Sequence, residues 1–371
     1  MKTTLALHEL GQSIWYDNIQ RSLLKNGELT RMINSGEIRG VTSNPSIFMK
    51  AITQSSDYDE SLAPLKKSGL SAEELFFELA IEDIQSATDQ FQSMYQESKR
   101  ADGYVSLEVS PYIADDMEET VRQAKDLWQR INRSNLMVKI PATKAGLPAI
   151  EEAIFAGINI NVTLIFSLTC YQEVMEAYMR GLERRDESGL PLGSIASVAS
   201  FFVSRIDTKV DNRLQDIIKE NGSKVEEAQP LLGKAAIASA RLAYDQFKHV
   251  FFGDRYLKLK AKGAHVQRPL WASTSTKNPN YRDVRYIEEL IGPDTVNTAP
   301  PHTLKAFLDH GIVEKTLEND LDAARTCMTD LEALGISMKA VTDELLEEGV
   351  KSFSDAFTVL LDAINKKIGA S

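Results

Sequence analysis

Eight short segments with the character of β-strands constrain this chain more than any other feature. The predicted strands cover residues 14–19, 40–44, 104–110, 136–142, 160–166, 195–204, 269–275 and 295–299. Nearly every gap between them is long enough for a helix, as parallel strands require. Eight such repeats favour a closed (β/α)8 barrel over an open doubly wound sheet, which more often has about five to seven strands. We therefore expect an α/β protein of the TIM-barrel type.

Apolar residues at helical spacing mark three of the predicted helices. Ser71 and Glu74 form a capping box before an apolar stripe that runs to Tyr95, and a second stripe runs over 117–131. A third stripe, over 341–368, predicts a long terminal helix that packs across the barrel. No repeat, low-complexity block or linker divides the chain. We expect one barrel domain over 1–371, with a C-terminal helical extension from about residue 318.

Composition excludes several classes of partner. The net charge of -11 argues against nucleic acid and anionic membranes, and no apolar run is long enough to span a bilayer. Cys170 and Cys327 are too far apart for a zinc motif, and the five histidines are scattered. No Gly-x-Gly-x-x-Gly or Walker loop follows a strand, so nucleotide cofactors lose their usual support. We expect a cytoplasmic protein with a small-molecule partner, no metal and no cofactor.

Lys139 lies inside the apolar segment 136–143, where a charge is costly. Side chains alternate across a strand, so Lys139 shares a face with Met137 and Pro141 and points where a core residue is expected. Burial disfavours the ammonium form, and a neutral amine can attack a carbonyl to form a Schiff base. A lysine that protects a sheet edge or reaches out to water is the alternative.

Polar residues recur near the carboxyl ends of the predicted strands, where a barrel places its chemistry. They are Asp17, Thr42, Asn44, Glu108, Lys139, Asn161, Thr163, Ser200, Arg205, Ser273, Ser275 and Lys277. Taken singly, most have a simpler explanation as turn formers, helix caps or solvated charges. Together, an amine, two carboxylates, hydroxyl and amide groups and two cations indicate an aldol-type enzyme that acts on a phosphorylated sugar.

The same segments resemble transaldolases, in the right order and over almost the whole chain. The matching segments are IWYD at 14–17, VTSNPS at 41–46, VKIPAT at 138–143, NVTLIFS at 161–167, SFFVSRI at 200–206 and RPLWAST at 268–274. The length resembles that of the longer bacterial subfamily. The resemblance implies a (β/α)8 barrel of the class I aldolase type with its amine on the fourth strand, which is where Lys139 falls.

The resemblance also implies an activity in the pentose phosphate pathway. A dihydroxyacetone unit would pass from sedoheptulose 7-phosphate to glyceraldehyde 3-phosphate, giving erythrose 4-phosphate and fructose 6-phosphate through a lysine Schiff base. In this reaction Lys139 would supply the amine and Asp17 the base, while Glu108 and Thr163 would hold a water molecule. Asn44 and Asn161 would bind hydroxyl groups of the donor, and Ser200 and Arg205 would bind its phosphate. Thr42 would support the pocket. Ser273 and Lys277 would add phosphate contacts. The expected partners are sugar phosphates, and assembly into a homo-oligomer is compatible with the sequence.

Two positions depart from the compact form of the family. Lys277 stands in place of an arginine, and Phe201 stands in place of a proline. A smaller relative, fructose 6-phosphate aldolase, is the nearest alternative, but Glu108 and Phe202 match the transaldolase pattern where aldolases have glutamine and tyrosine. A sugar-phosphate-binding protein without catalysis and a lysine-base isomerase are further alternatives. Ligand binding without turnover would favour the first, and isotope exchange without C–C cleavage the second.

Overall fold

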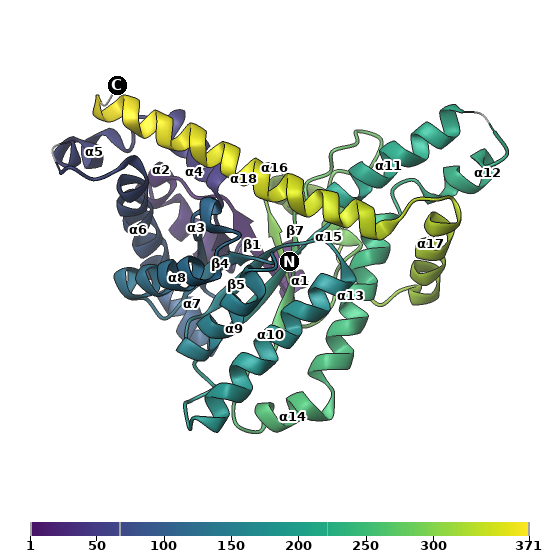
Figure 1. Ribbon diagram of the computed structural model, residues 1–371, viewed down its shortest axis with the longest axis horizontal. Coiled ribbons are helices and arrows are strands. Elements are labelled where there is room, and N and C mark those ends of the chain that lie inside the picture. Colours follow the sequence, from purple (N-terminus) through teal and green to yellow (C-terminus); the bar gives the residue numbers. More distant parts are fainter. Residues whose placement is uncertain (1, 67, 221, 370–371) are drawn as a thin grey trace.

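Eight parallel strands close into one barrel in chain order (Figure 1). The computed structural model describes residues 2–66, 68–220 and 222–369; residues 1, 67, 221 and 370–371 of the predicted domain lie outside the described residues. The strands are β1 Gln12–Asp17, β2 Gly40–Thr42, β3 Tyr104–Glu108, β4 Leu136–Pro141, β5 Ile160–Ile165, β6 Ser197–Phe202, β7 Gln267–Ala272 and β8 Thr295–Ala299. β8 pairs with β1 to close the barrel. The predicted fold class is confirmed.

All eight predicted strands exist, but several end earlier than the sequence suggested. β6 stops at Phe202 because α11 begins at Ser204, and β7 stops at Ala272. Ser273 has a φ of 56°, a left-handed conformation that breaks the extended chain. Ser275 and Lys277 therefore lie in the loop after β7, beyond the strand end near which the sequence placed them.

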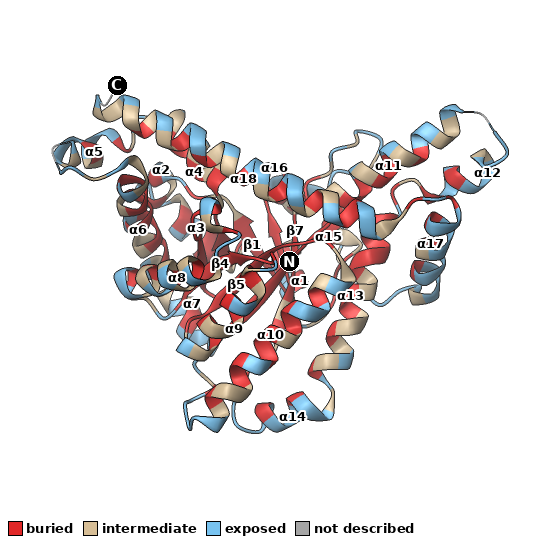
Figure 2. Cartoon of the chain, in the orientation of Figure 1, coloured by how far each residue is buried: buried red, intermediate tan, exposed pale blue. Residues whose placement is uncertain are grey.

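Helices surround the barrel and separate its strands. They are α1 Thr3–Glu9, α2 Arg21–Lys25, α3 Glu28–Asn34, α4 Pro45–Thr53, α5 Asp59–Leu65, α6 Ala72–Gln90, α7 Gln92–Glu97, α8 Met117–Ile131, α9 Gly146–Ala156, α10 Leu168–Glu187, α11 Ser204–Lys219, α12 Val225–Ala228, α13 Ala235–Phe251, α14 Asp254–Lys260, α15 Arg285–Glu288, α16 Pro301–His310, α17 Leu321–Ala333 and α18 Met338–Ile368. The capping box of Ser71 and Glu74 is present at α6. Figure 2 shows the buried stripes of these helices facing the buried strands.

α18 forms the long terminal helix that the apolar stripe predicted, and it runs across the barrel (Figure 1). Its buried face packs on α4, α6 and α11. Ion pairs fix its outer edge to α11, where Lys209 contacts Glu344 and Glu348, and Arg213 contacts Glu344. Within the described residues, no helix combines the length and the apolar character that crossing a bilayer requires.

Candidate active site

A small cavity of about 100 Å³ opens at the carboxyl ends of the strands. Its lining residues are Asp17, Thr42, Asn44, Lys139, Thr163, Ser200, Phe202, Arg205, Ala272, Ser273, Thr298 and Phe353. Of the eleven residues to which the resemblance assigns a role, eight are in this set, so the tertiary structure brings together most of what the sequence separated. The other three, Glu108, Asn161 and Lys277, lie outside this lining.

Lys139 projects from β4 into the barrel, and only 5% of the residue is exposed. Its amine Nζ donates a hydrogen bond to the carbonyl oxygen of Ser43 at 2.8 Å. Nζ also lies 3.1 Å from Oε2 of Glu108, its register partner on β3, in a buried ion pair. Because Lys139 borders the cavity, its amine is placed to meet a carbonyl carbon there.

Two buried oxygens near Lys139 lack a hydrogen-bond partner among the described residues. They are Glu108 Oε2 and Thr163 Oγ1. Burial raises the pKa of the Glu108 carboxyl above its usual range, although the nearby Lys139 charge partly offsets this effect. Buried polar atoms are normally satisfied, so these two positions call for a water molecule or a ligand.

Asp17, the last residue of β1, is hydrogen-bonded to the first of two linked threonine hydroxyl groups. Thr42 Oγ1 donates to Asp17 Oδ1 at 2.7 Å, and Thr42 Oγ1 lies 2.6 Å from Thr298 Oγ1, so Thr298 must donate to Thr42. Burial raises the pKa of Asp17, while the Thr42 hydrogen bond and the Lys139 charge act in the opposite direction. We did not select Thr298 from the sequence, although a polar residue near the end of the eighth predicted strand was the available signal.

The end of the cavity at Arg205 is positively charged. Arg205, in the first turn of α11, makes no hydrogen bond or ion pair within the described residues, and burial lowers the pKa of its guanidinium. Lys277 lies on the exposed loop beside it. Partial burial, followed by the positive charges of Arg205 and Lys50, lowers the pKa of Lys277. Lys50 was missed because only the fold brings α4 to this place. Such a cluster fits an anion such as phosphate.

Of the two predicted asparagines, Asn44 lines the cavity, whereas Asn161 lies behind the lining residues. Asn44 caps α4, where its Oδ1 accepts from Ile47 N at 3.0 Å, while its NH₂ group has no hydrogen-bond partner among the described residues. Asn161 is fully buried instead: its Nδ2 donates to Ser106 Oγ at 3.1 Å, and its Oδ1 accepts from Ser200 Oγ at 2.7 Å. Asn161 therefore supports Ser200 from behind the cavity wall.

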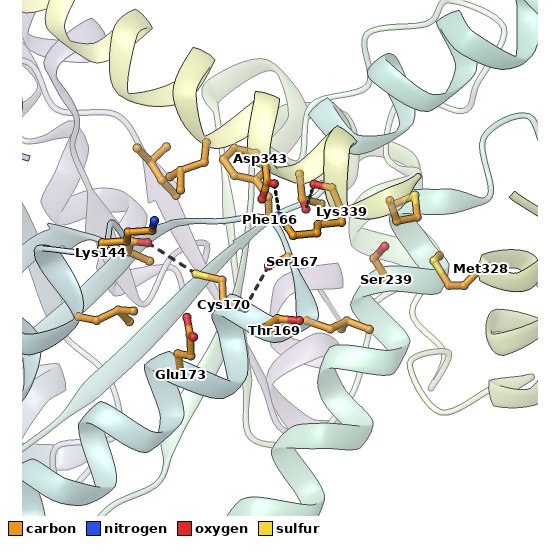
Figure 3. A pocket seen from close by; sticks show the side chains of 17 residues that line it. Lys144, Phe166, Ser167, Thr169, Cys170, Glu173, Ser239, Met328, Lys339 and Asp343 are labelled. Atoms are coloured by element: carbon orange, nitrogen blue, oxygen red, sulfur yellow. Dashed lines mark hydrogen bonds and ion pairs between the residues drawn. The ribbon is translucent and has the colours of Figure 1, made fainter. Parts of the chain in front are cut away.

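A larger cavity of about 430 Å³ lies beside α10 and the start of α18 (Figure 3). Its labelled polar residues include Cys170, whose thiol contacts the carbonyl oxygen of Ala142. Burial raises the pKa of this thiol to about 12. Lys144 and Glu173 on its wall are exposed. The smaller cavity, with the buried Lys139 amine and the Asp17 carboxylate on its wall, is thus the better candidate for chemistry. Among the described residues, no cluster of His, Cys, Asp or Glu could hold a metal ion.

The fold and this site define a (β/α)8-barrel protein with a buried lysine, a buried glutamate and a half-buried aspartate at the carboxyl ends of its strands. The family model described as "Transaldolase/Fructose-6-phosphate aldolase" matches residues 14–364. The chain therefore belongs to this family.

Similar proteins span the chain from end to end. "Transaldolase 2" of Nostoc punctiforme is 45% identical over 98% of this chain and 97% of its own length. "Transaldolase" of Mycolicibacterium smegmatis is 45% identical over 99% of this chain and 97% of its own length. "Transaldolase 1" of Streptomyces coelicolor is 45% identical over 98% and 94%, respectively. The resemblance that the sequence motifs suggested is confirmed.

Proposed function

We propose that this protein is a transaldolase that transfers a dihydroxyacetone unit through a Schiff base on Lys139. The donor is sedoheptulose 7-phosphate and the acceptor is glyceraldehyde 3-phosphate, so the products are erythrose 4-phosphate and fructose 6-phosphate. The observation that carries the proposal is the Lys139 amine, buried, bordering the cavity and 3.1 Å from a carboxylate. The family and the names of the relatives add support.

The first half of the reaction forms the covalent intermediate. Once its proton has passed to Glu108, the Lys139 amine attacks C2 of the donor ketose, and loss of one water molecule from the carbinolamine gives an iminium ion. Glu108, paired with the Lys139 amine, and Thr163, whose buried Oγ1 has no hydrogen-bond partner among the described residues, hold a water molecule that carries protons between the amine and the departing hydroxyl. The raised pKa of Glu108 suits a group that must both accept and return a proton.

The second half breaks the C3–C4 bond. Asp17 removes the proton of the C4 hydroxyl, the electrons of the C3–C4 bond move into the iminium, and the aldose phosphate leaves with its new carbonyl. The remaining enamine on Lys139 then attacks the carbonyl of the acceptor, Asp17 returns its proton, and hydrolysis with one water molecule releases the new ketose. Thr42, bonded to Asp17, keeps that carboxylate oriented toward the cavity.

The remaining residues bind the substrate. Arg205 contacts the phosphate, Ser200 donates to it when its hydroxyl proton turns from Asn161 to the phosphate, Ser273 lines the same end, and Lys277 adds charge from its loop. The free amide NH₂ of Asn44 binds a donor hydroxyl, while Asn161 holds Ser200 in place. The chain acts as a single-domain enzyme in the cytoplasm, with no metal or cofactor.

Borohydride trapping tests this proposal. Protein incubated with fructose 6-phosphate, with and without a chelator, is reduced with borohydride, and the added mass is located by peptide mass spectrometry. We expect an adduct on Lys139 under both conditions, no adduct in Lys139→Ala, and a retained adduct with little C–C cleavage in Asp17→Ala. Trapping by Lys139→Ala would overturn the assignment of the amine. Binding of the sugar phosphate without any adduct would favour a non-catalytic protein.

Transfer must also be separated from simple cleavage, because the family includes fructose 6-phosphate aldolases. Phe202 lines the cavity and Glu108 pairs with the lysine, at the two positions where the transaldolase pattern differs from that of the aldolases. The measurement is product formation from fructose 6-phosphate with and without erythrose 4-phosphate. A transaldolase forms sedoheptulose 7-phosphate and depends on the acceptor, whereas an aldolase releases dihydroxyacetone without it.

A further inference from the structure

Phe353 gives the catalytic cavity an apolar wall that does not come from the barrel. Of the residues that line the cavity, nine have polar side chains, and the apolar ones are Phe202, Ala272 and Phe353. Phe353 belongs to the C-terminal helix α18, and only 4% of it is exposed. The terminal helix therefore contributes directly to the site, a role beyond the core packing that its apolar stripe suggested.

Contacts one turn before and one turn after Phe353 fix its position. A Cβ on Gly349 would lie 3.0 Å from Cδ2 of Leu164, so the absence of a side chain lets α18 approach β5 closely. Phe357 is fully buried, and its ring lies 5.2 Å from that of Phe76 and 5.2 Å from that of Tyr112, edge to face in both pairs. These contacts hold the phenyl ring of Phe353 at the cavity with little freedom to withdraw.

The chemistry of the intermediate gives this wall a purpose, and the argument here rests on the proposed function. After C3–C4 cleavage, Lys139 carries a three-carbon enamine. Attack on an aldose carbonyl completes the transfer. Protonation of the enamine carbon from water, followed by hydrolysis of the iminium with one water molecule, instead releases dihydroxyacetone and the free amine. The polar lining would retain water, whereas an apolar wall excludes it.

We propose that Phe353 is a specificity-determining residue that favours transfer over release. It covers one side of the cavity with an apolar ring, and so keeps water from the enamine until an acceptor aldehyde enters. Its contribution is independent of the bond-making groups, because it offers no proton, charge or hydrogen bond. It also makes the terminal helix a determinant of which reaction this barrel performs.

The test is the ratio of dihydroxyacetone release to sedoheptulose 7-phosphate formation in Phe353→Ala, with fructose 6-phosphate as donor and erythrose 4-phosphate as acceptor. Both rates come from the same sample, so the ratio does not depend on the fraction of folded protein. We expect the ratio to rise about tenfold, which corresponds to about 1.4 kcal/mol of barrier. Phe353→Leu keeps most of the apolar volume and should give a smaller rise.

Phe247→Leu is the matched control for Phe353→Leu, since it makes the same chemical change at a fully buried residue of α13, away from the cavity lining. It should lower stability and leave the ratio unchanged. If Phe353→Ala does not fold, Phe353→Leu carries the test. An unchanged ratio in a variant that still forms the Lys139 adduct overturns the role of Phe353 alone, whereas a wild-type protein without an adduct overturns the proposed function.

Discussion

The amine of Lys139 and the carboxylate of Glu108 lie 3.1 Å apart, with each side chain only 6% exposed. They come from neighbouring strands and face each other in register, β3 to β4. Each charge compensates the other where water is nearly excluded, which is how a barrel interior can tolerate both. A proton that moves between them, or through a water molecule beside them, would leave the amine neutral and reactive.

Glu108→Gln should slow formation of the covalent intermediate without changing its location. Glutamine is close to glutamate in size but cannot accept a proton, so the loss should be about 10²- to 10⁴-fold in the rate of adduct formation, as for removal of a general acid or base. Single-turnover trapping by borohydride measures this rate, and the adduct should still be on Lys139. A wild-type trapping rate would remove Glu108 from the proton pathway.

Thr42→Val should move the acidic limb of the pH profile to higher pH. The Thr42 hydroxyl stabilises the charged form of Asp17, so its removal raises the pKa of Asp17 further above its usual value. Since Asp17 must be deprotonated to act as base, kcat/KM at low pH falls, while the plateau at higher pH changes less. The profile of kcat/KM against pH measures the shift. A limb that stays in place would show that another group controls it.

Arg205→Ala should weaken binding of phosphorylated donors specifically. A hydrogen bond to a charged group contributes about 1.5–3 kcal/mol, so kcat/KM for fructose 6-phosphate should fall about ten- to hundredfold, with little change for unphosphorylated fructose. Lys277→Ala should have a smaller effect because that side chain is exposed on a loop. Lys144→Ala, at an exposed lysine of the larger cavity, is the control. Equal losses for both sugars would argue against phosphate recognition by Arg205.

Asp207→Asn should change how stability depends on pH. Asp207 is buried, accepts hydrogen bonds from Tyr286 Oη at 2.6 Å and Ala236 N at 2.7 Å, and has a pKa that burial raises from 3.8 to about 6. Because the pKa is higher in the folded than in the unfolded state, this group stabilises the fold most below the unfolded pKa, and that contribution is lost as pH rises through about 6.

The difference between a pKa of 3.8 and one of about 6 corresponds to about 3 kcal/mol at most. The free energy of unfolding of wild type relative to Asp207→Asn should therefore decrease by up to that amount between about pH 4 and about pH 8. Urea unfolding of both proteins across this range measures the difference, in which the titration of the other groups largely cancels. A difference that is independent of pH would mean that Asp207 has a similar pKa in the folded and unfolded states.

The sequence by itself determined the number of strands, their order and the apolar faces of the main helices. These features are local, because alternation and helical spacing are properties of neighbouring residues. Lys139 was identifiable for the same reason, as a charge inside an apolar strand. Strand ends were less certain: the left-handed conformation of Ser273 ended β7 early, and no local pattern announced it.

The tertiary structure decided which polar residues share a site and how. Asn161 has the same strand parity as Thr163, yet Asn161 is bonded behind the wall while Thr163 borders the cavity. Thr298 lies in the site because β8 closes the barrel, and Phe353 lies there because α18 crosses the end of the barrel. Parity gives the face of a strand, but depth within the barrel and contacts between distant segments depend on strand register and helix packing, which only the folded chain determines.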